Sequence, residues 1–328
     1  MHRRPTDLPL ISIVVPMFNE AQSLDAFCAR LCATADAMHE VRVEIVCVND
    51  GSSDATWPML LKAARNDPRF VLLDLSRNFG KEAALTAGLH EARGDAVVPI
   101  DADLQDPPEL IPSLVARWRE GFDVVLARRS ARDGDGYWKQ LGGRLFYRLH
   151  NRLAETPLPD DVGDFRLLDR KVVDALMRLP ERRRFLKGMF AWLGFRTTTV
   201  DYVRSARVGG RSKFTLRGLV DFGLDGVFSF STAPLRVWIY FGLAIAAAAF
   251  LYASFIVVRT LVQGVDVPGY ASLIVIGLFL GGIQLVGIGV VGEYVGRIYG
   301  EVKQRPLYLI RERVAADRPQ PGSPAGPS

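Results

Sequence analysis

A short acidic segment in the middle of the chain has the residue types and spacing of a divalent-cation site. Asp101 and Asp103 are separated by one residue, and Gln105 supplies a third oxygen two positions later. Such oxygen ligands suit a hard cation such as Mg²⁺ that also holds a diphosphate. Asp pairs also occur in turns and helix caps, and we assign the adjacent Asp106 to the cap of the following helix. The segment indicates a metal and phosphate site.

The sequence lacks the patterns of two other common kinds of site. It contains no GxxxxGK[ST] run, which argues against a P-loop nucleotide-binding protein. Its three cysteines, Cys28, Cys32 and Cys47, have no second cysteine pair or nearby histidine that would complete a zinc site. Three cysteines cannot form a disulfide framework, which fits a reducing compartment. We interpret them as small, buried apolar side chains.

The elements that must position the acidic segment alternate regularly. Short runs rich in β-branched residues are separated by segments whose apolar residues have helical spacing. This rhythm predicts an α/β fold with a doubly wound, mostly parallel sheet and helices on both faces. The predicted strands cover residues 11–15, 44–48, 71–75, 96–100 and 124–127, and three predicted helices cover residues 24–37, 81–92 and 109–120.

Polar segments follow four consecutive predicted strands directly. They are PMFNE at 16–20, NDGSSD at 49–54, SRNFGK at 76–81 and DADLQD at 101–106. Asp50 with its two following residues also has an ordinary interpretation as a turn. Because ligands of open α/β sheets bind beyond the carboxyl ends of the strands, we expect the four segments to meet at one edge.

Length and composition restrict the class of protein further. The chain has 328 residues, 49% hydrophobic and 23% charged, so it can bury a core and is not a disordered polyelectrolyte. At roughly 150 residues per domain, about two domains are expected. The formal net charge of +5 suits a partner with phosphates, whether nucleic acid, nucleotide or an anionic membrane.

Two long uncharged stretches predict a membrane hairpin. Residues 237–258 and 267–292 have no charged side chain over 22 and 26 positions. Each exceeds the ~20 residues that a helix needs to cross the hydrocarbon layer. Two buried core helices are the alternative, although such helices rarely run this far without a charge.

The flanking charges predict the orientation of the hairpin. Residues 203–236 contain six basic and two acidic side chains, and residues 293–313 contain five basic and three acidic ones. The connecting residues 260–269 contain no lysine or arginine, although Arg259 directly precedes them. The positive-inside rule therefore places both termini in the cytoplasm. The first apolar run is too short for a signal peptide, so the soluble part is expected to stay in the cytosol.

The motifs VVPMFNE, VNDGSSDAT, SRNFGKEAAL and DADLQDPPE resemble those of the family 2 glycosyltransferases. The downstream segments GDFRLLDR, GGRSKFTLRGL and GEYVGRIYGEVKQRPLY narrow the resemblance to the branch that loads a sugar onto a polyprenyl phosphate. That branch includes dolichyl-phosphate mannose synthases and bactoprenol glucosyltransferases, and the two-span tail looks most like the latter. The resemblance covers roughly residues 10–310. It implies a nucleotide-sugar-binding domain of the glycosyltransferase A type, a Mg²⁺ or Mn²⁺ cofactor and inversion at the anomeric carbon.

The resemblance also implies a donor site. Its expected members are Pro16, Phe18, Glu20, Asp50, Lys81, Asp101, Ala102 and Asp103. The first three would surround the nucleobase and ribose, and Asp50 would contact the base or the ribose. Asp101 would lie at the ribose or the metal, and Asp103 and Gln105 would bind the metal.

The acceptor side is expected to be basic, because a lipid phosphate needs cationic partners. Arg129 lies just past the fifth predicted strand, at the same edge, and we assign it both phosphate binding and a part in catalysis. Arg144 is a weaker phosphate ligand. Arg207 and Lys213 lie between the soluble part and the first span, beside two glycines that allow close backbone approach.

Asp164 matches the family position usually considered for a catalytic base. A phosphate monoester has a second pKa of ~6, so at neutral pH the proposed acceptor is already mostly dianionic and is its own nucleophile. Asp164 would therefore take a residual proton or, in the favoured interpretation, position the acceptor and its arginines. The alternative is a turn residue paired with Arg166.

Two further features belong to the membrane part. Residues 214–230 carry polar side chains at a spacing of four, which predicts an interfacial amphipathic helix, with a buried core helix as the alternative. Glu293 and Arg297 are one helical turn apart, and we expect them to form a structural pair.

These features predict four parts. They are a cytosolic nucleotide-sugar-binding domain at 1–205, a basic juxtamembrane segment with the interfacial helix at 206–234, two transmembrane helices at 235–300, and a cytosolic tail at 301–328 whose end is disordered. A homo-oligomer is compatible with the sequence, and a nucleic-acid partner is not expected.

The predicted function is inverting transfer of one sugar from a nucleotide sugar, expected to be UDP-linked, to undecaprenyl phosphate at the bacterial cytoplasmic membrane. A processive polysaccharide synthase is disfavoured because the sequence has no QxxRW motif and only two spans. A membrane-anchored nucleotide-sugar sensor is disfavoured by the intact acidic segment. The sequence leaves open whether the sugar is glucose, an N-acetylhexosamine, mannose or formylated aminoarabinose.

Overall fold

The computed structural model describes residues 8–129, 162–182, 184, 186–202, 233–263 and 269–315. The chain divides into two compact units, one of residues 1–144, 158–215 and 305–328, the other of residues 145–157 and 216–304. Arg144, Arg207, Lys213 and the interfacial helix expected at 214–230 lie outside the described residues.

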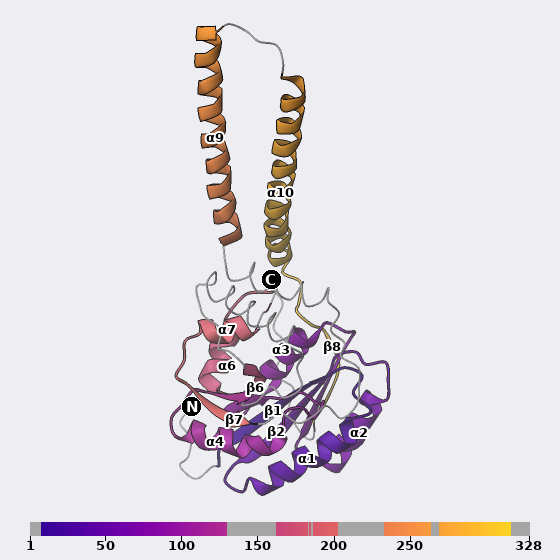
Figure 1. Ribbon diagram of the computed structural model, residues 1–328. Helices are drawn as coiled ribbons and strands as arrows, with labels where there is room; N and C mark the ends of the chain where they lie inside the picture. The colour runs from indigo at the N-terminus through magenta and orange to yellow at the C-terminus, as the bar shows by residue number, and fades with distance from the viewer. Residues whose placement is uncertain are drawn as a thin grey trace, which may run out of the picture. The chain divides into compact units, whose positions relative to one another are not determined.

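Within the described residues, eight strands of the first unit form one sheet in the order β7-β5-β6-β4-β1-β2-β3-β8 (Figure 1). Strands β1 to β5 and β7 run in one direction, whereas β6 and β8 are antiparallel to their neighbours. The predicted mostly parallel sheet is confirmed. The strands are β1 (Leu10–Met17), β2 (Arg42–Asn49), β3 (Phe70–Leu75), β4 (Ala96–Pro99), β5 (Val124–Arg129), β6 (Val162–Asp169), β7 (Thr197–Tyr202) and β8 (Ile310–Ala315).

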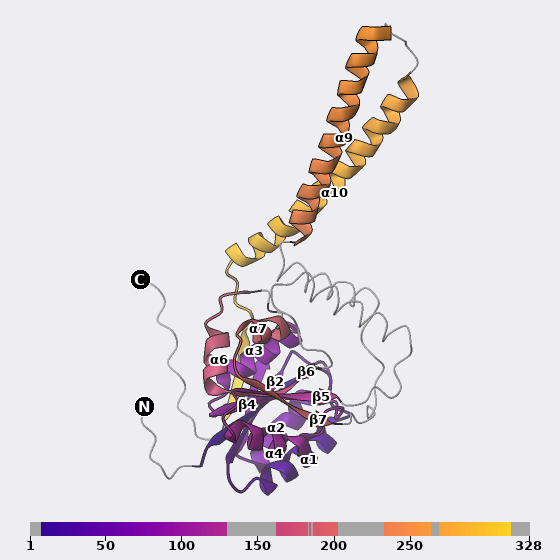
Figure 2. The same cartoon turned by 60° about the vertical axis from the view of Figure 1, so that its left-hand side comes forward.

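Helices cover both faces of this sheet, as Figure 2 shows. One face carries α1 (Leu24–Ala37), α2 (Thr56–Asn66) and α4 (Ile111–Arg119), the last preceded by the 3₁₀ turn η1 (Pro108–Leu110). The other face carries α3 (Lys81–Glu91), α6 (Arg170–Met177) and α7 (Leu186–Trp192). The three predicted helices therefore form, with ends within one or two residues of the expected ones.

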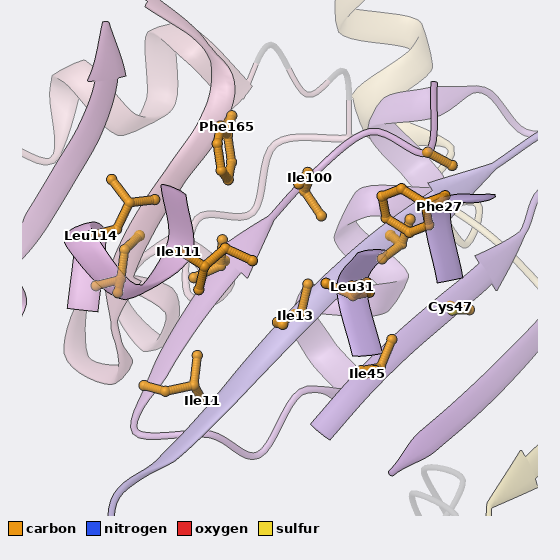
Figure 3. Packing of buried hydrophobic residues seen from close by; sticks show 14 of the residues in the cluster. Ile11, Ile13, Phe27, Leu31, Ile45, Cys47, Ile100, Ile111, Leu114 and Phe165 are labelled. Carbon is orange, nitrogen blue, oxygen red and sulfur yellow. The ribbon is translucent and has the colours of Figure 1, made fainter. Parts of the chain in front are cut away.

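The core explains why the strands are mostly apolar. Ile11 and Ile13 of β1 are fully buried in one cluster with Phe27 and Leu31 of α1 (Figure 3). On the opposite face α3 packs so closely that a Cβ at Gly88 would lie 2.3 Å from a methyl carbon of Val14. Because both faces are covered, β1 buries apolar side chains on each of them, and the hydroxyl of its buried Ser12 donates to Glu44 of β2.

The second unit contains the two long helices that the uncharged stretches predict. Helix α9 (Ala233–Gln263) has 31 residues and α10 (Tyr270–Val302) has 33, and the two run side by side (Figures 1 and 2). Large apolar side chains of both helices, among them Phe250, Leu261 and Leu285, are exposed. Within the part of the chain that the structure describes, Phe279–Val302 is long and apolar enough to cross a membrane.

One close approach joins the two helices, and one ion pair forms within α10. A Cβ at Gly287 of α10 would lie 2.2 Å from the indole nitrogen of Trp238 on α9, so only a glycine permits this approach. Arg297 donates a hydrogen bond to Glu293 at 2.8 Å, which confirms the predicted pair.

Strand β8 returns the chain to the sheet after the hairpin. Residues 310–315, which were expected to belong to a tail, pair antiparallel with β3. The segments before and after the hairpin thus belong to one folded unit. If both helices cross a membrane, the two ends of the hairpin must lie on the same side of it.

Candidate active site

The loops after β1 and β2 are joined by hydrogen bonds at the carboxyl edge of the sheet. The backbone N–H of Asn19 donates to Ser52 Oγ at 2.9 Å, and the N–H of Ser53 donates back to Asn19 Oδ1 at 2.8 Å. The N–H of Glu20 donates to Thr56 Oγ1 at 3.0 Å. Pro16 at the end of β1 and Phe18 beside it are half-buried at the same edge. The expected meeting of these two segments is confirmed.

Asp50 holds the third loop against the second. Its carboxylate accepts the N–H of Phe79 at 2.7 Å and the N–H of Gly80 at 2.9 Å, and the residue is 3% exposed. Gly51 has a φ of 65°, and a Cβ there would lie 2.4 Å from the Arg77 carbonyl carbon. Burial raises the pKa of Asp50, and the two N–H donors oppose that shift. The carboxylate expected at the base or ribose is thus also what positions residues 76–80.

Lys81 joins two carboxylates from different strands. Its Nζ donates to Asp101 at 2.7 Å and to Asp164 Oδ2 at 2.8 Å. Lys81 is the first residue of α3, Asp101 lies two residues past β4, and Asp164 is the third residue of β6. All three were predicted site residues, and the structure brings them together.

The antiparallel direction of β6 explains how Asp164 reaches this edge. β4 and β6 pair with Ala96 opposite Asp169 and Val97 opposite Leu168. Each step toward the carboxyl end of β4 is therefore a step toward the beginning of β6. The same register, continued, puts Asp101 level with Asp164. Asp164 lies in a strand and pairs with Lys81, so its alternative interpretation as a turn residue is wrong.

The charges of this cluster favour a cation. One ammonium faces two carboxylates, and Asp103 adds a third carboxylate close enough to affect Asp101. Burial alone would lower the pKa of Lys81, but Asp164 and Asp101 together raise it well above its usual value. Burial raises the pKa of Asp101, with Lys81 opposing and Asp164 adding to the shift. The ammonium therefore stays charged, and by formal charge the three carboxylates outnumber it.

The 101–105 loop presents its oxygen-bearing side chains on one side. Ala102 and Leu104 are buried, whereas Asp101, Asp103 and Gln105 are partly exposed. Leu104 has a positive φ of 60°, and the N–H of Gln105 donates to Asp103 Oδ1 at 3.1 Å. Ala102, an expected donor-site member, thus contributes no exposed side-chain surface.

This oxygen-only donor set fits Mg²⁺ or Mn²⁺ better than a softer metal. Among the residues that the structure describes, no group of three or more His, Cys, Asp or Glu side chains is arranged to hold a metal ion. Cys47 is buried and Cys28 and Cys32 are half-buried against the core, as expected for structural cysteines.

The assignment of Asp106 as a helix cap is wrong. The cap position of η1 is Pro107, and Asp106 is buried and accepts a short hydrogen bond from the Tyr202 hydroxyl. Tyr202 ends β7, 96 residues further along the chain. No local pattern in the sequence marks that partner.

Two arginines end β5, one of them the predicted phosphate ligand Arg129. The expected strand extends to Arg129, whose backbone lies opposite Tyr202 in the register. Arg128 forms a bidentate ion pair with Asp201, with distances of 2.7 and 2.9 Å. Arg128 therefore has a structural partner at the surface of the sheet.

The buried place of Arg166 was not predicted from the sequence. This side chain is 4% exposed, donates to the Gly163 carbonyl at 2.6 Å and stacks over the Phe190 ring at 4.5 Å. Its Nε has no hydrogen-bond partner within the described part of the protein. Phe165 beside it is fully buried, so the segment around Asp164 is held firmly from both sides.

Comparisons with known proteins show the family of this chain. Residues 12–177 match the family model "Glycosyl transferase family 2", and residues 233–298 match the model "GtrB C-terminal hairpin". The bactoprenol glucosyl transferase derived from the SfII prophage of Shigella flexneri is 51% identical over 302 residues, covering 92% of this chain and 97% of that protein. A prophage bactoprenol glucosyl transferase homolog of Escherichia coli is 48% identical, with 92% and 98% covered.

Solved structures are more distant. A mannosyltransferase from Pyrobaculum calidifontis, in complex with GDP-Man and Mn²⁺, is 18% identical with a TM-score of 0.44, covering 87% of this chain and 84% of that one. The family models and the close relatives, which extend over nearly the whole chain, confirm the resemblance found in the motifs. The chain is a membrane-associated glycosyltransferase and belongs to glycosyl transferase family 2.

Proposed function

We propose that this chain transfers one glucosyl residue from UDP-glucose to undecaprenyl phosphate at the cytoplasmic face of the membrane. The observation that carries the proposal is the junction of Lys81, Asp101 and Asp164 at the carboxyl edge of the sheet, in a chain with a membrane hairpin. Two relatives share about half of their residues with this chain over nearly their full length, and both are bactoprenol glucosyl transferases. This likeness supports the choice of sugar and acceptor.

Asp101, Asp103 and Gln105 would hold a Mg²⁺ or Mn²⁺ ion. The ion would neutralise the diphosphate that leaves the donor sugar. Lys81 holds Asp101 and Asp164 through its ammonium, and Asp50 keeps residues 76–80 against the nucleoside side of the site.

The acceptor phosphate attacks the anomeric carbon itself. A phosphate oxygen forms the new bond to that carbon while the bond from carbon to the donor diphosphate breaks, with inversion. Because a phosphate monoester with a second pKa of ~6 is mostly dianionic at neutral pH, no strong base is needed. Asp164 therefore acts as a positioning group, and Arg129, Arg144, Arg207 and Lys213 are proposed to bind the lipid phosphate.

Turnover assays test the proposal directly. Membranes containing the protein are incubated with labelled nucleotide sugars, with and without undecaprenyl phosphate and a chelator. We expect a product with one glucose per lipid, and Asp103→Ala should lower turnover by about 100-fold or more, the scale of losing one electrostatic stabiliser. Asp25→Ala, a matched control at an exposed position of α1, should keep normal turnover.

Other outcomes would assign a different function. Polymer growing from one acceptor would indicate a processive synthase, and nucleotide-sugar binding without turnover would indicate a sensor. Full activity of Asp103→Ala in the presence of chelator would remove the metal from the mechanism.

Cysteine labelling tests the proposed orientation. In a background without the native cysteines, a cysteine at Val265 should react with an impermeant thiol reagent added to intact cells. A cysteine at Lys62, an exposed position on α2, should react only after the cells are permeabilised. The reverse pattern would place the catalytic unit outside the cell.

A further inference from the structure

Arg311 lies at an irregularity of β8, the strand that follows the membrane hairpin. Asp74 of β3 pairs with Glu312 and Leu75 pairs with Ile310, so Arg311 is an extra residue between two paired ones. Such a bulge leaves its residue unpaired and turns the side chain away from the regular direction. Arg311 is therefore free to reach across the end of β3.

The Arg311 guanidinium contacts β3 where the third loop of the site begins. Its Nη2 donates to the Ser76 carbonyl at 2.8 Å, and the N–H of Ser76 donates to the Leu309 carbonyl at 2.8 Å. Both backbone polar groups of Ser76 are thus held by the segment after the hairpin. The loop that follows, residues 77–80, ends in the two N–H groups that bind Asp50.

The same guanidinium also reaches the second loop through buried groups. Arg311 Nη1 lies 3.2 Å from Asp74 Oδ2, and the Asp74 side chain is 3% exposed. Asp74 Oδ1 accepts a hydrogen bond from Asn49 Nδ2 at 2.7 Å, and Asn49 Oδ1 accepts the N–H of Ser52 at 3.3 Å. One side chain of β8 therefore contacts the third loop directly and is linked to the second through Asp74 and Asn49.

The segment that carries Arg311 is fixed on the sheet by further contacts. The Tyr308 hydroxyl lies 3.1 Å from His90 Nδ1, and Arg182 donates to the Arg305 carbonyl at 2.7 Å. Arg313 pairs with Glu91 of α3, at 3.0 Å from its Nε. Arg311 is the member of this set that contacts a donor-site loop, at Ser76, whereas Arg313 contacts the far end of α3.

We propose that Arg311 is a positioning residue of the nucleotide-sugar site, through which the strand after the hairpin sets the geometry of the loops at 49–54 and 76–80. The inference rests on the proposed function, because it takes these loops as the donor site. A guanidinium suits this role because one planar group can serve a carboxylate and a carbonyl at once, which a lysine ammonium does less well.

The test compares Arg311→Ala, Arg311→Lys and the matched control Arg313→Ala in the full-length protein. Calorimetry measures the binding of UDP-glucose in the presence of Mg²⁺, and initial rates give separate KM values for UDP-glucose and undecaprenyl phosphate. We expect Arg311→Ala to raise the Kd and the KM for UDP-glucose about tenfold and to leave the KM for the lipid unchanged. Arg311→Lys should recover part of the loss, and Arg313→Ala should bind UDP-glucose like the wild type.

Equal Kd values of Arg311→Ala and Arg313→Ala for UDP-glucose would overturn the inference. A change confined to the KM for undecaprenyl phosphate would overturn it too. If Arg311→Ala does not fold, Arg311→Lys decides: binding equal to the wild type with an unchanged KM for UDP-glucose would refute the role. If the wild type binds UDP-glucose but transfers nothing to undecaprenyl phosphate, the proposed function is wrong and the binding data still decide on Arg311. Absence of UDP-glucose binding by the wild type would refute both.

Discussion

Replacing Lys81 by methionine removes the ammonium between Asp101 and Asp164 and keeps most of the side-chain volume. The Nζ lies 2.7 and 2.8 Å from oxygens of the two carboxylates, so these oxygens are at most about 5.5 Å apart. At an effective dielectric constant of ~20, two unit charges at that distance repel by about 3 kcal/mol. Without Lys81 the two carboxylates face each other uncompensated.

Solvent reduces this repulsion. The side chains of Lys81, Asp101 and Asp164 are 45%, 34% and 23% exposed, so the charges are partly screened. We expect Lys81→Met to lower the free energy of unfolding by ~1–2 kcal/mol, since partly exposed charges keep only part of the unscreened interaction. Turnover should fall by about 100-fold, because a displacement of ~1 Å at a reacting centre costs that much.

Urea unfolding of the detergent-solubilised protein, at low and at high salt, measures the first effect. Because added salt screens exposed charges, the loss of stability should shrink between roughly 0.05 and 1 M salt. Lys62→Met, at an exposed position of α2, is the control and should change stability and turnover little. A stability loss equal to that of Lys62→Met, or one that salt does not reduce, would refute the reasoning.

Three other substitutions or reactions test the packing around the site. Tyr202→Phe removes the hydroxyl that donates to buried Asp106 and should lower the free energy of unfolding, measured in urea, by ~1–3 kcal/mol. An unchanged free energy of unfolding would mean that Asp106 finds another donor. Gly88→Ala places a methyl group against Val14 and should cost about 1–3 kcal/mol by overpacking; an unchanged unfolding midpoint would show that α3 can shift freely. Burial raises the pKa of Cys28 to about 12, so at pH 8 this thiol should be alkylated far more slowly in native protein than in urea-unfolded protein. Mass spectrometry measures the two rates, and rapid alkylation of Cys28 in native protein would contradict its burial.

Much of the fold follows from local sequence patterns. The five β-branched runs became β1 to β5, because strands covered on both faces are apolar at most positions. The length and lack of charge of the two stretches in the second unit sufficed to predict α9 and α10. The four polar segments that follow parallel strands had to lie at one edge of the sheet, since parallel strands all end at that edge.

Strand order and register decided the rest. Lys81 meets Asp164 across 83 residues because β6 is inserted antiparallel beside β4, and no local pattern specifies that neighbour. Asp106 binds Tyr202 rather than a helix terminus for the same reason. Residues 310–315 have no sheet partner until the chain returns to β3, so their pattern alone resembles a tail. The residue types of the site were thus determined by the sequence, whereas their pairing depended on contacts between distant segments, which only the packed sheet brings within hydrogen-bond distance.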